Sequence, residues 1–180
     1  MAYKATDVAE WILWQAANNG INLSPLQLQK LLYYCQAYSL GMAGERLFSE
    51  RILAWQHGPV VAEVFHRYKR FVSKKITPPK NAIIPDDAIG IVDAVLSKKG
   101  ILSAGELRNA THAETPYSST ALNDEISSEK IKEYFVGHFW TSDEEDEYEP
   151  AFDNSEDERE FFRESLPEWK KQAILDAITK

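Results

Sequence analysis

The segment from Ser24 to Gly44 constrains the fold most, because residue type specifies both of its ends and one of its faces. Ser24 stands at an N-cap position, with Pro25 at the first helical position and Gln27 at capping-box spacing. An apolar stripe follows at i, i+3, i+4, i+7 spacing: Leu28, Leu31, Leu32 and Cys35. The segment therefore predicts a long helix, and its glycines at 41 and 44 are suited to end it.

Helix signals of the same kind recur along the chain and leave little room for strands. Five further helices are predicted over residues 7–18, 59–73, 86–99, 103–110 and 127–139. Thr6 or Asp7 is the expected cap of the first, and Pro59 the expected first residue of the second. The fold class is therefore mainly α, a compact domain of six or more helices.

One stretch does not follow the helical period. In residues 46–56, which include LFSERILAWQ, neither face of a strand alternates cleanly. This pattern predicts a short strand or a β-hairpin. His57, Gly58 and Pro59 then break the chain before the next helix.

The charge is divided unevenly, and this division sets the expected domain organisation. The net charge is −8 overall. Residues 1–140 hold 15 Lys and Arg against 14 Asp and Glu, whereas residues 141–180 hold 5 against 14. We expect a helical domain over 1–140 and an acidic linker with a C-terminal helical extension over 141–180. Phe161, Phe162 and Trp169 are the apolar anchors expected in that extension.

Composition excludes several classes of protein. The single cysteine, Cys35, allows neither an internal disulfide nor a cysteine-based zinc site. No apolar stretch approaches the roughly 18 residues of a membrane span, and no secretory signal is evident. The expectation is a cytoplasmic protein with no membrane partner. The acidic charge also argues against nucleic acid as a partner of the whole chain.

No catalytic or metal-binding pattern stands out, so we expect a protein that is not an enzyme and needs no cofactor or metal. His57, Glu63 and His66 could gather near one helix end, but a tight turn and a surface position explain the two histidines more simply. His112 and Glu114 have the H-x-E spacing of zinc deaminases, yet the cysteine pair of that motif is absent. Cys35, on an apolar stripe, is expected to be a buried small hydrophobe.

Two clusters admit both a structural and a binding interpretation. Tyr33, Tyr34 and Tyr38 could stack on bases, but core and rim positions are favoured. Residues 67–80 form a basic run with no acid inside it. Its basic residues are Arg67, Lys69, Arg70, Lys74, Lys75 and Lys80. The run could meet phosphate, an acidic partner or the acidic tail of the same chain, or be a solvated surface.

A series of short motifs in a fixed order resembles the Panacea domain, the domain of SocA-type antitoxins and of many phage-associated proteins. The motif residues are Lys30, Leu31, Leu32, Tyr33, Tyr34, Leu47, Phe48, Ala54, Trp55, Gly58, Pro59, Val60, Leu107, Thr111, His112, Glu114, Pro116 and Tyr117, followed by a closing helix over 131–135. The resemblance covers about residues 5–136. Tyr117 stands where the family usually has Trp.

The resemblance implies an antitoxin that neutralises a cognate toxin, usually encoded by the adjacent gene, by direct protein contact. It leaves two alternatives open: a proteolytic adaptor that delivers the toxin to a host protease, and a phage-associated regulator that binds nucleic acid. It carries over no catalytic residue. The motif residues are expected to form the fold. The expected partner-binding residues are Trp55, His57 and Tyr117, as exposed anchors, with Arg67, Lys69 and Arg70.

Overall fold

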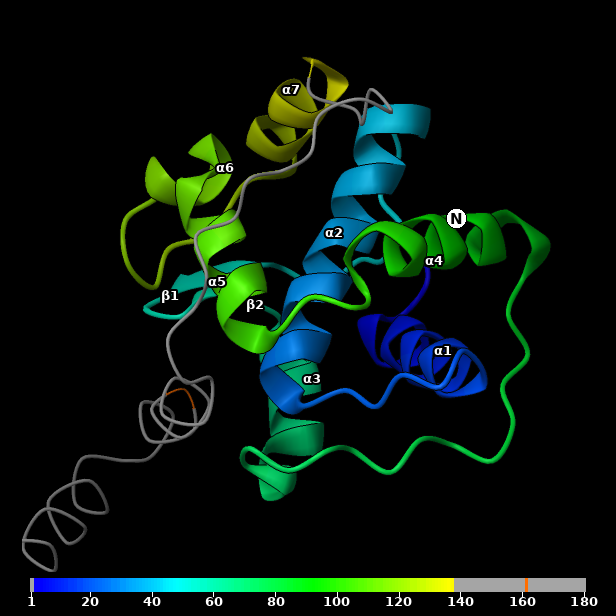
Figure 1. The fold of residues 1–180 in the computed structure, drawn as a ribbon. Coiled ribbons are helices and arrows are strands. Elements are labelled where there is room, and N and C mark those ends of the chain that lie inside the picture. Colours follow the sequence, from blue (N-terminus) through cyan, green and yellow to red (C-terminus); the bar gives the residue numbers. More distant parts are fainter. Residues whose placement is uncertain (1, 138–160, 162–180) are drawn as a thin grey trace, which may run out of the picture.

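The computed structural model describes residues 2–137 and 161, and within them the chain is mainly α-helical, as predicted (Figure 1). The described helices are α1 (Ala5–Asn18), α2 (Pro25–Ala43), α3 (Ala62–Tyr68), the 3-10 turn η1 (Lys69–Phe71), α4 (Asp86–Lys99), α5 (Ala104–Ala113), α6 (Thr115–Ser118) and α7 (Ser128–Gly137). One antiparallel hairpin joins β1 (Leu53–Trp55) to β2 (Gly58–Val60).

Helix α2 is the centre of the fold. It runs through the middle of the domain and contacts α1, α3, α4, α5, α7 and β2 (Figure 1). Its predicted start is confirmed, because the Ser24 hydroxyl and the Gln27 side chain form a reciprocal capping box. Its end is confirmed at Gly44, which adopts a left-handed conformation with φ of 73°. Helix α2 is thus the scaffold against which α1, α3, α4, α5, α7 and β2 pack.

The burial of α2 extends beyond the predicted apolar stripe to polar positions on its other faces. Gln29 and Gln36 are both buried and bond to backbone groups of other segments. The Gln36 side chain accepts from the N–H groups of Leu47 and Phe48, at 2.8 and 3.0 Å, and donates to the Phe48 carbonyl. The Gln29 amide makes the equivalent pair of bonds with Val61. These glutamines fix the two ends of the segment that carries the hairpin.

The start of α1 corrects the sequence prediction. The helix begins two residues earlier than predicted, and its N-cap residue Lys4 makes no side-chain cap. Glu50, from a distant loop, instead accepts the Ala5 N–H at 2.9 Å. The predicted capping by Thr6 or Asp7 is therefore wrong, because a carboxylate brought in by the tertiary fold has taken that role.

The hairpin lies later in the chain than its predicted range. Only β1 falls within residues 46–56, and Pro59 lies in β2 opposite Ala54. The prediction that Pro59 begins a helix is therefore wrong: α3 starts at Ala62 and passes into η1 at Lys69. A proline is tolerated in a strand at the sheet's edge, where its missing N–H breaks no ladder bond.

The bounds of the remaining described helices agree closely with those predicted from the sequence. Helix α4 spans the predicted residues, and Ser103 with Glu106 forms the predicted capping box of α5. The Ser127 hydroxyl accepts from the Lys130 N–H at the start of α7. The one-turn helix α6 is an addition that periodicity cannot detect. No helix in residues 2–137 is long and apolar enough to cross a membrane.

The predicted acidic linker and C-terminal helices lie outside the described residues, except for Phe161. That residue is helical and buried. The predicted division at residue 140 stays a prediction.

Replacement of Gln36 by Met should lower the free energy of unfolding by about 2–4 kcal/mol, because it leaves three buried backbone groups of residues 47 and 48 without their partner. Urea unfolding followed by circular dichroism measures the change. The control is Gln56→Met at an exposed turn position, which should change stability by less than about 0.5 kcal/mol. Equal losses in the two variants would contradict the anchoring role.

Candidate functional site

A buried carboxylate joins α2 to the corner between α5 and α6. Glu114 is 9% exposed and accepts hydrogen bonds from the hydroxyls of Tyr33, at 2.9 Å, and Tyr34, at 2.7 Å. Burial, followed by the nearby charge of Glu114, raises the pKa of Tyr33 well above its ordinary value. The Tyr33 hydroxyl therefore stays protonated and keeps its role as a donor. Both tyrosines are core residues, as the sequence favoured.

A buried lysine joins α2 to the hairpin. Lys30 is 0% exposed, and its ammonium group donates to the Pro59 carbonyl at 3.0 Å. Gly58, beside it, has φ of 100°, a conformation that L side chains rarely adopt. A Cβ added at Gly58 would lie 2.9 Å from both Lys30 Nζ and Thr111 Oγ1. The glycine is thus required by conformation and by close approach together.

The turn between the strands is held against α5. His57 Nδ1 accepts from Arg108 Nε at 3.1 Å. The two ring nitrogens of His112 lie 2.7 Å from the Arg108 carbonyl oxygen and 2.9 Å from that of Gln56. Burial is the main cause that lowers the pKa of His112. The Tyr117 hydroxyl completes the arrangement by donating to the Trp55 carbonyl at 2.7 Å.

The three expected aromatic anchors therefore differ in accessibility. His57 is 1% exposed, so the expectation that it is an exposed anchor is wrong, because the turn folds back onto Arg108. Tyr117 is half-buried and its ring meets the His112 ring edge-on at 4.4 Å. Trp55 is half-buried and packs edge-on against Phe65 of α3 at 5.3 Å. Their roles in partner binding stay predictions.

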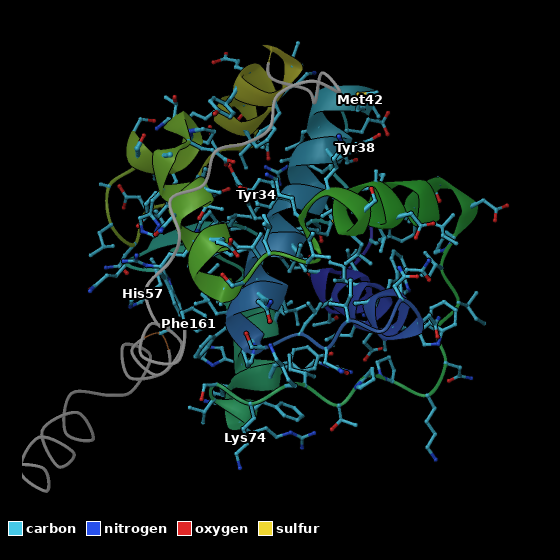
Figure 2. All side chains as sticks on the ribbon, in the orientation of Figure 1. Tyr34, Tyr38, Met42, His57, Lys74 and Phe161 are labelled. Carbon is cyan, nitrogen blue, oxygen red and sulfur yellow. The ribbon has the colours of Figure 1, made fainter. Side chains whose placement is uncertain are left out.

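An aromatic side chain from the C-terminal region occupies the surface next to the turn. Phe161 is 1% exposed and lies beside His57 (Figure 2). It belongs to a small hydrophobic cluster separate from the main core. The other members of the cluster are Leu26, Val60, Phe65 and Ala104, with Trp55 packed against them. We call these five residues, together with Lys30 and His57, the aromatic pocket.

The basic run begins two residues after the pocket residue Phe65. Lys69, Arg70, Lys74 and Lys80 are exposed. Arg67 is already engaged, because its guanidinium pairs with Glu10 of α1. Lys75 donates to the Gln27 side chain at 2.9 Å. The structure thus separates the run into residues that fasten α1 and α2 and residues that present positive charge to solvent.

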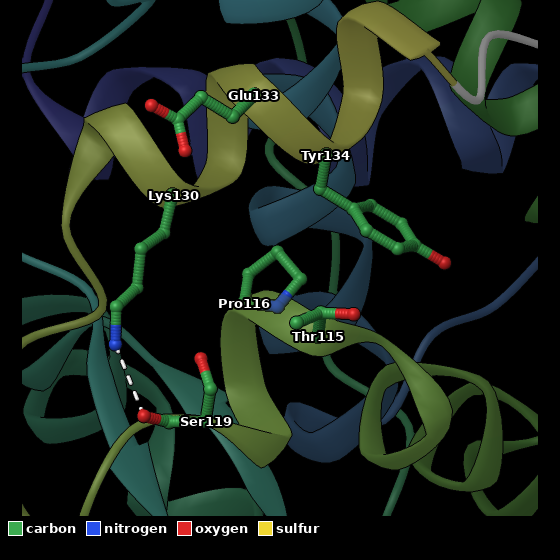
Figure 3. Close-up of a pocket in the computed structure, with 6 residues that line it drawn as sticks. All are labelled: Thr115, Pro116, Ser119, Lys130, Glu133 and Tyr134. Atoms are coloured by element: carbon green, nitrogen blue, oxygen red, sulfur yellow. Dashed lines mark hydrogen bonds between the residues drawn. The ribbon is translucent and has the colours of Figure 1, made fainter.

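A separate shallow pocket of about 390 Å³ lies between α6 and α7 (Figure 3). Its lining residues are Thr115, Pro116, Ser119, Lys130, Glu133 and Tyr134. The Lys130 ammonium group donates to the Ser119 carbonyl, at 3.0 Å, and to the Thr120 hydroxyl, at 3.2 Å. The lysine thus serves to fasten α7 to the end of α6.

The chemically capable side chains of the motifs are engaged in holding the fold. Lys30, His57 and Glu114 each bond to another element, and burial raises the pKa of the Cys35 thiol well above its ordinary range. The thiol is therefore unreactive, as expected for a buried small hydrophobe. In the described part of the chain, no three His, Cys, Asp or Glu residues gather as metal ligands would. His66 is exposed on α3, as predicted.

Some residues that shape the site were not singled out from the sequence. Arg108, Gln29 and Gln36 act through backbone or ring contacts far away in sequence, and no local pattern marks them. Phe161 was expected only as an anchor of the C-terminal extension. Its neighbour in space, Phe65, lies on a predicted helix, but nothing in the sequence joins the two.

Comparison with known proteins gives one match. A family model described as "Antitoxin SocA-like, Panacea domain" matches residues 28–118. These residues include α2 from its first turn, the hairpin, and the helices up to α6. No curated protein and no solved structure matches the chain.

Replacement of Gly58 by Ala should lower the free energy of unfolding by about 2–5 kcal/mol, because it adds backbone strain and displaces Lys30 or Thr111 from its buried position. Gly90 provides a matched control in α4, where an added Cβ meets nothing within 4 Å. Gly90→Ala should raise stability by about 0.5–1 kcal/mol. Thermal unfolding of both variants measures the difference, and a Gly58→Ala variant as stable as the wild type would refute the close-approach argument.

Proposed function

The chain belongs to the family of SocA-like antitoxins with a Panacea domain, and from this premise we propose that it neutralises a cognate toxin by direct protein–protein binding. The family match covers half of the chain and contains the hairpin, its supporting network and most of the aromatic pocket. The gene next to that of the antitoxin is the proposed source of the toxin.

The observation that carries the proposal is the role of the motif residues in the fold. Lys30, Glu114 and His112 could in principle perform acid–base chemistry, but each is tied to a carbonyl or a hydroxyl of another element. They hold a short hairpin in a defined position on α2 and α5. A rigid surface presented by a satisfied network supports recognition of a partner. We therefore propose a binding role and no enzymatic activity.

The surface around the hairpin has the residue types that anchor protein interfaces. Trp55 is half-buried at the domain surface, and Lys69 and Arg70 are exposed next to α3. Tryptophan and arginine are enriched among the residues that contribute most to binding energy. The exposed basic residues favour an acidic surface on the toxin. Trp55, Lys69 and Arg70 therefore keep their predicted role in partner binding as part of this proposal.

Co-expression with the neighbouring open reading frame tests the proposal. The neighbour alone should arrest growth, and growth should return when this chain is produced with it. The double variant Lys69→Glu/Arg70→Glu should weaken binding of the toxin by about tenfold or more, because it places negative charge against an acidic surface. Growth curves and a pull-down of the two proteins measure these effects.

Lys98→Glu provides the control. Lys98 is exposed in the last turn of α4, so this substitution reverses a surface charge on a different helix. It should rescue growth as the wild type does. A neighbour that is harmless alone, or that stays toxic in the presence of this chain, would contradict the antitoxin role. Disappearance of the toxin only in cells with an intact protease would assign the adaptor mechanism in place of blocking.

A further inference from the structure

Phe161 is enclosed by side chains from four elements. Its ring meets that of Phe65 (α3) edge-on at 5.2 Å and that of Trp55 (β1) at 6.5 Å. The His57 ring, in the hairpin turn, is perpendicular to it at 6.5 Å. The ammonium group of Lys30 (α2) lies 5.8 Å from the ring centroid. Edge-to-face aromatic neighbours and a cation near the ring are specific to an aromatic occupant.

The pocket and its occupant come from different parts of the chain. Every pocket residue except Leu26 lies within the residues matched by the family model, 28–118. Phe161 lies well beyond that match and follows the acidic stretch of the chain. The pocket is therefore a feature of the antitoxin domain, whereas its occupant belongs to the C-terminal extension.

The walls of the pocket are fixed by bonds that do not involve Phe161. His57 is held by Arg108, Lys30 by the Pro59 carbonyl, and the Trp55 backbone by Tyr117. Residues that are held in place independently of the occupant form a preorganised binding site. Another aromatic side chain with the same approach can therefore occupy this pocket.

The charges around the pocket and around Phe161 indicate that the incoming aromatic side chain belongs to an acidic segment. The five residues before Phe161 hold four acids, Glu156, Asp157, Glu158 and Glu160, against one base, Arg159. On the domain, Lys69 and Arg70 are exposed just beyond Phe65. An aromatic residue that follows a net acidic segment thus matches the pocket and the exposed basic residues that follow Phe65 in the chain.

We propose that the aromatic pocket is a recognition site for a phenylalanine within an acidic segment of the toxin, and that Phe161 of the same chain occupies this site until the toxin displaces it. The inference rests on the proposed function and deepens it. It assigns Trp55, Phe65, Lys30 and His57 as the contacts of the incoming ring. Phe161 then competes with the toxin for the pocket and lowers the apparent affinity of the chain for the toxin.

Competition has a measurable consequence. A peptide that enters the pocket binds only the fraction of molecules in which Phe161 has left it, so its apparent affinity falls by that fraction. Burial of one phenylalanine ring corresponds to a factor of about ten or more in an equilibrium constant. Removal of the Phe161 ring should therefore strengthen peptide binding about tenfold or more.

The test uses the full-length chain and a fluorescein-labelled peptide with the sequence of residues 155–166, SEDEREFFRESL. Fluorescence anisotropy should show binding to the Phe161→Ala variant that is at least about tenfold tighter than binding to the wild type. Added salt should weaken the binding, because exposed charges contribute to it. A peptide in which alanine replaces the phenylalanine of position 161 should not bind.

The neighbouring phenylalanine provides the matched control. Phe162→Ala removes a ring of the same kind one residue away and should bind the peptide as weakly as the wild type does. Trp55→Ala in the Phe161→Ala background should abolish binding, because it removes one wall of the pocket. Circular dichroism establishes that each variant is folded. Phe161→Ser is a second variant that removes the ring from the pocket, and it should bind the peptide as Phe161→Ala does.

Equal peptide affinity for the wild type and Phe161→Ala would overturn the inference, as would tight binding to Phe162→Ala or unchanged binding after loss of Trp55. These outcomes do not depend on a toxin. If the neighbouring gene product is harmless while the peptide binds as described, the proposed function fails and the pocket stands. If neutralisation succeeds without peptide binding, the antitoxin role stands and the pocket assignment fails.

Discussion

The fold depends on polar groups that are buried and satisfied around α2. Glu114 accepts from two tyrosine hydroxyls, and Lys30 donates to a carbonyl of β2. A buried charge without such partners would cost several kcal/mol, so these contacts admit few alternative arrangements. They fasten the hairpin and the corner between α5 and α6 to one central helix. The hairpin that is held in this way carries Trp55 and His57 of the aromatic pocket, which Tyr117 and Arg108 contact.

This arrangement explains why a domain whose motifs are rich in Lys, His, Tyr and Glu has a proposed role in binding. The same residue types that serve catalysis in other proteins here satisfy backbone carbonyls and one another. These contacts hold a short hairpin in which the half-buried Trp55 packs against Phe65 of α3. Lys69 and Arg70, which follow α3 in the chain, are exposed.

Local signals predicted the helices, and long-range contacts account for the differences. The capping boxes at Ser24 and Ser103 need only residues three apart, so the sequence revealed both. The cap of α1 comes from Glu50, 45 residues away from Ala5, and no local rule anticipates it. The sequence predicts that Pro59 begins a helix, but it lies in a strand. There its carbonyl accepts a hydrogen bond from Lys30, and the preceding Gly58 adopts a positive φ. The buried positions of Tyr33 and Tyr34 agree with the core positions that the sequence favoured, whereas the burial of His57 depends on Arg108, a residue of another helix.

Amide hydrogen exchange of the full-length chain, alone and in complex with the co-expressed toxin, tests most directly whether the toxin binds at the hairpin that the buried network holds. Toxin binding should change the exchange of β1, β2 and α3, which contribute residues to the aromatic pocket, while the interior of α2 stays as protected as before. A complex in which α6 and α7 become protected and the hairpin is unchanged would contradict this assignment, because the partner would then bind away from the aromatic pocket.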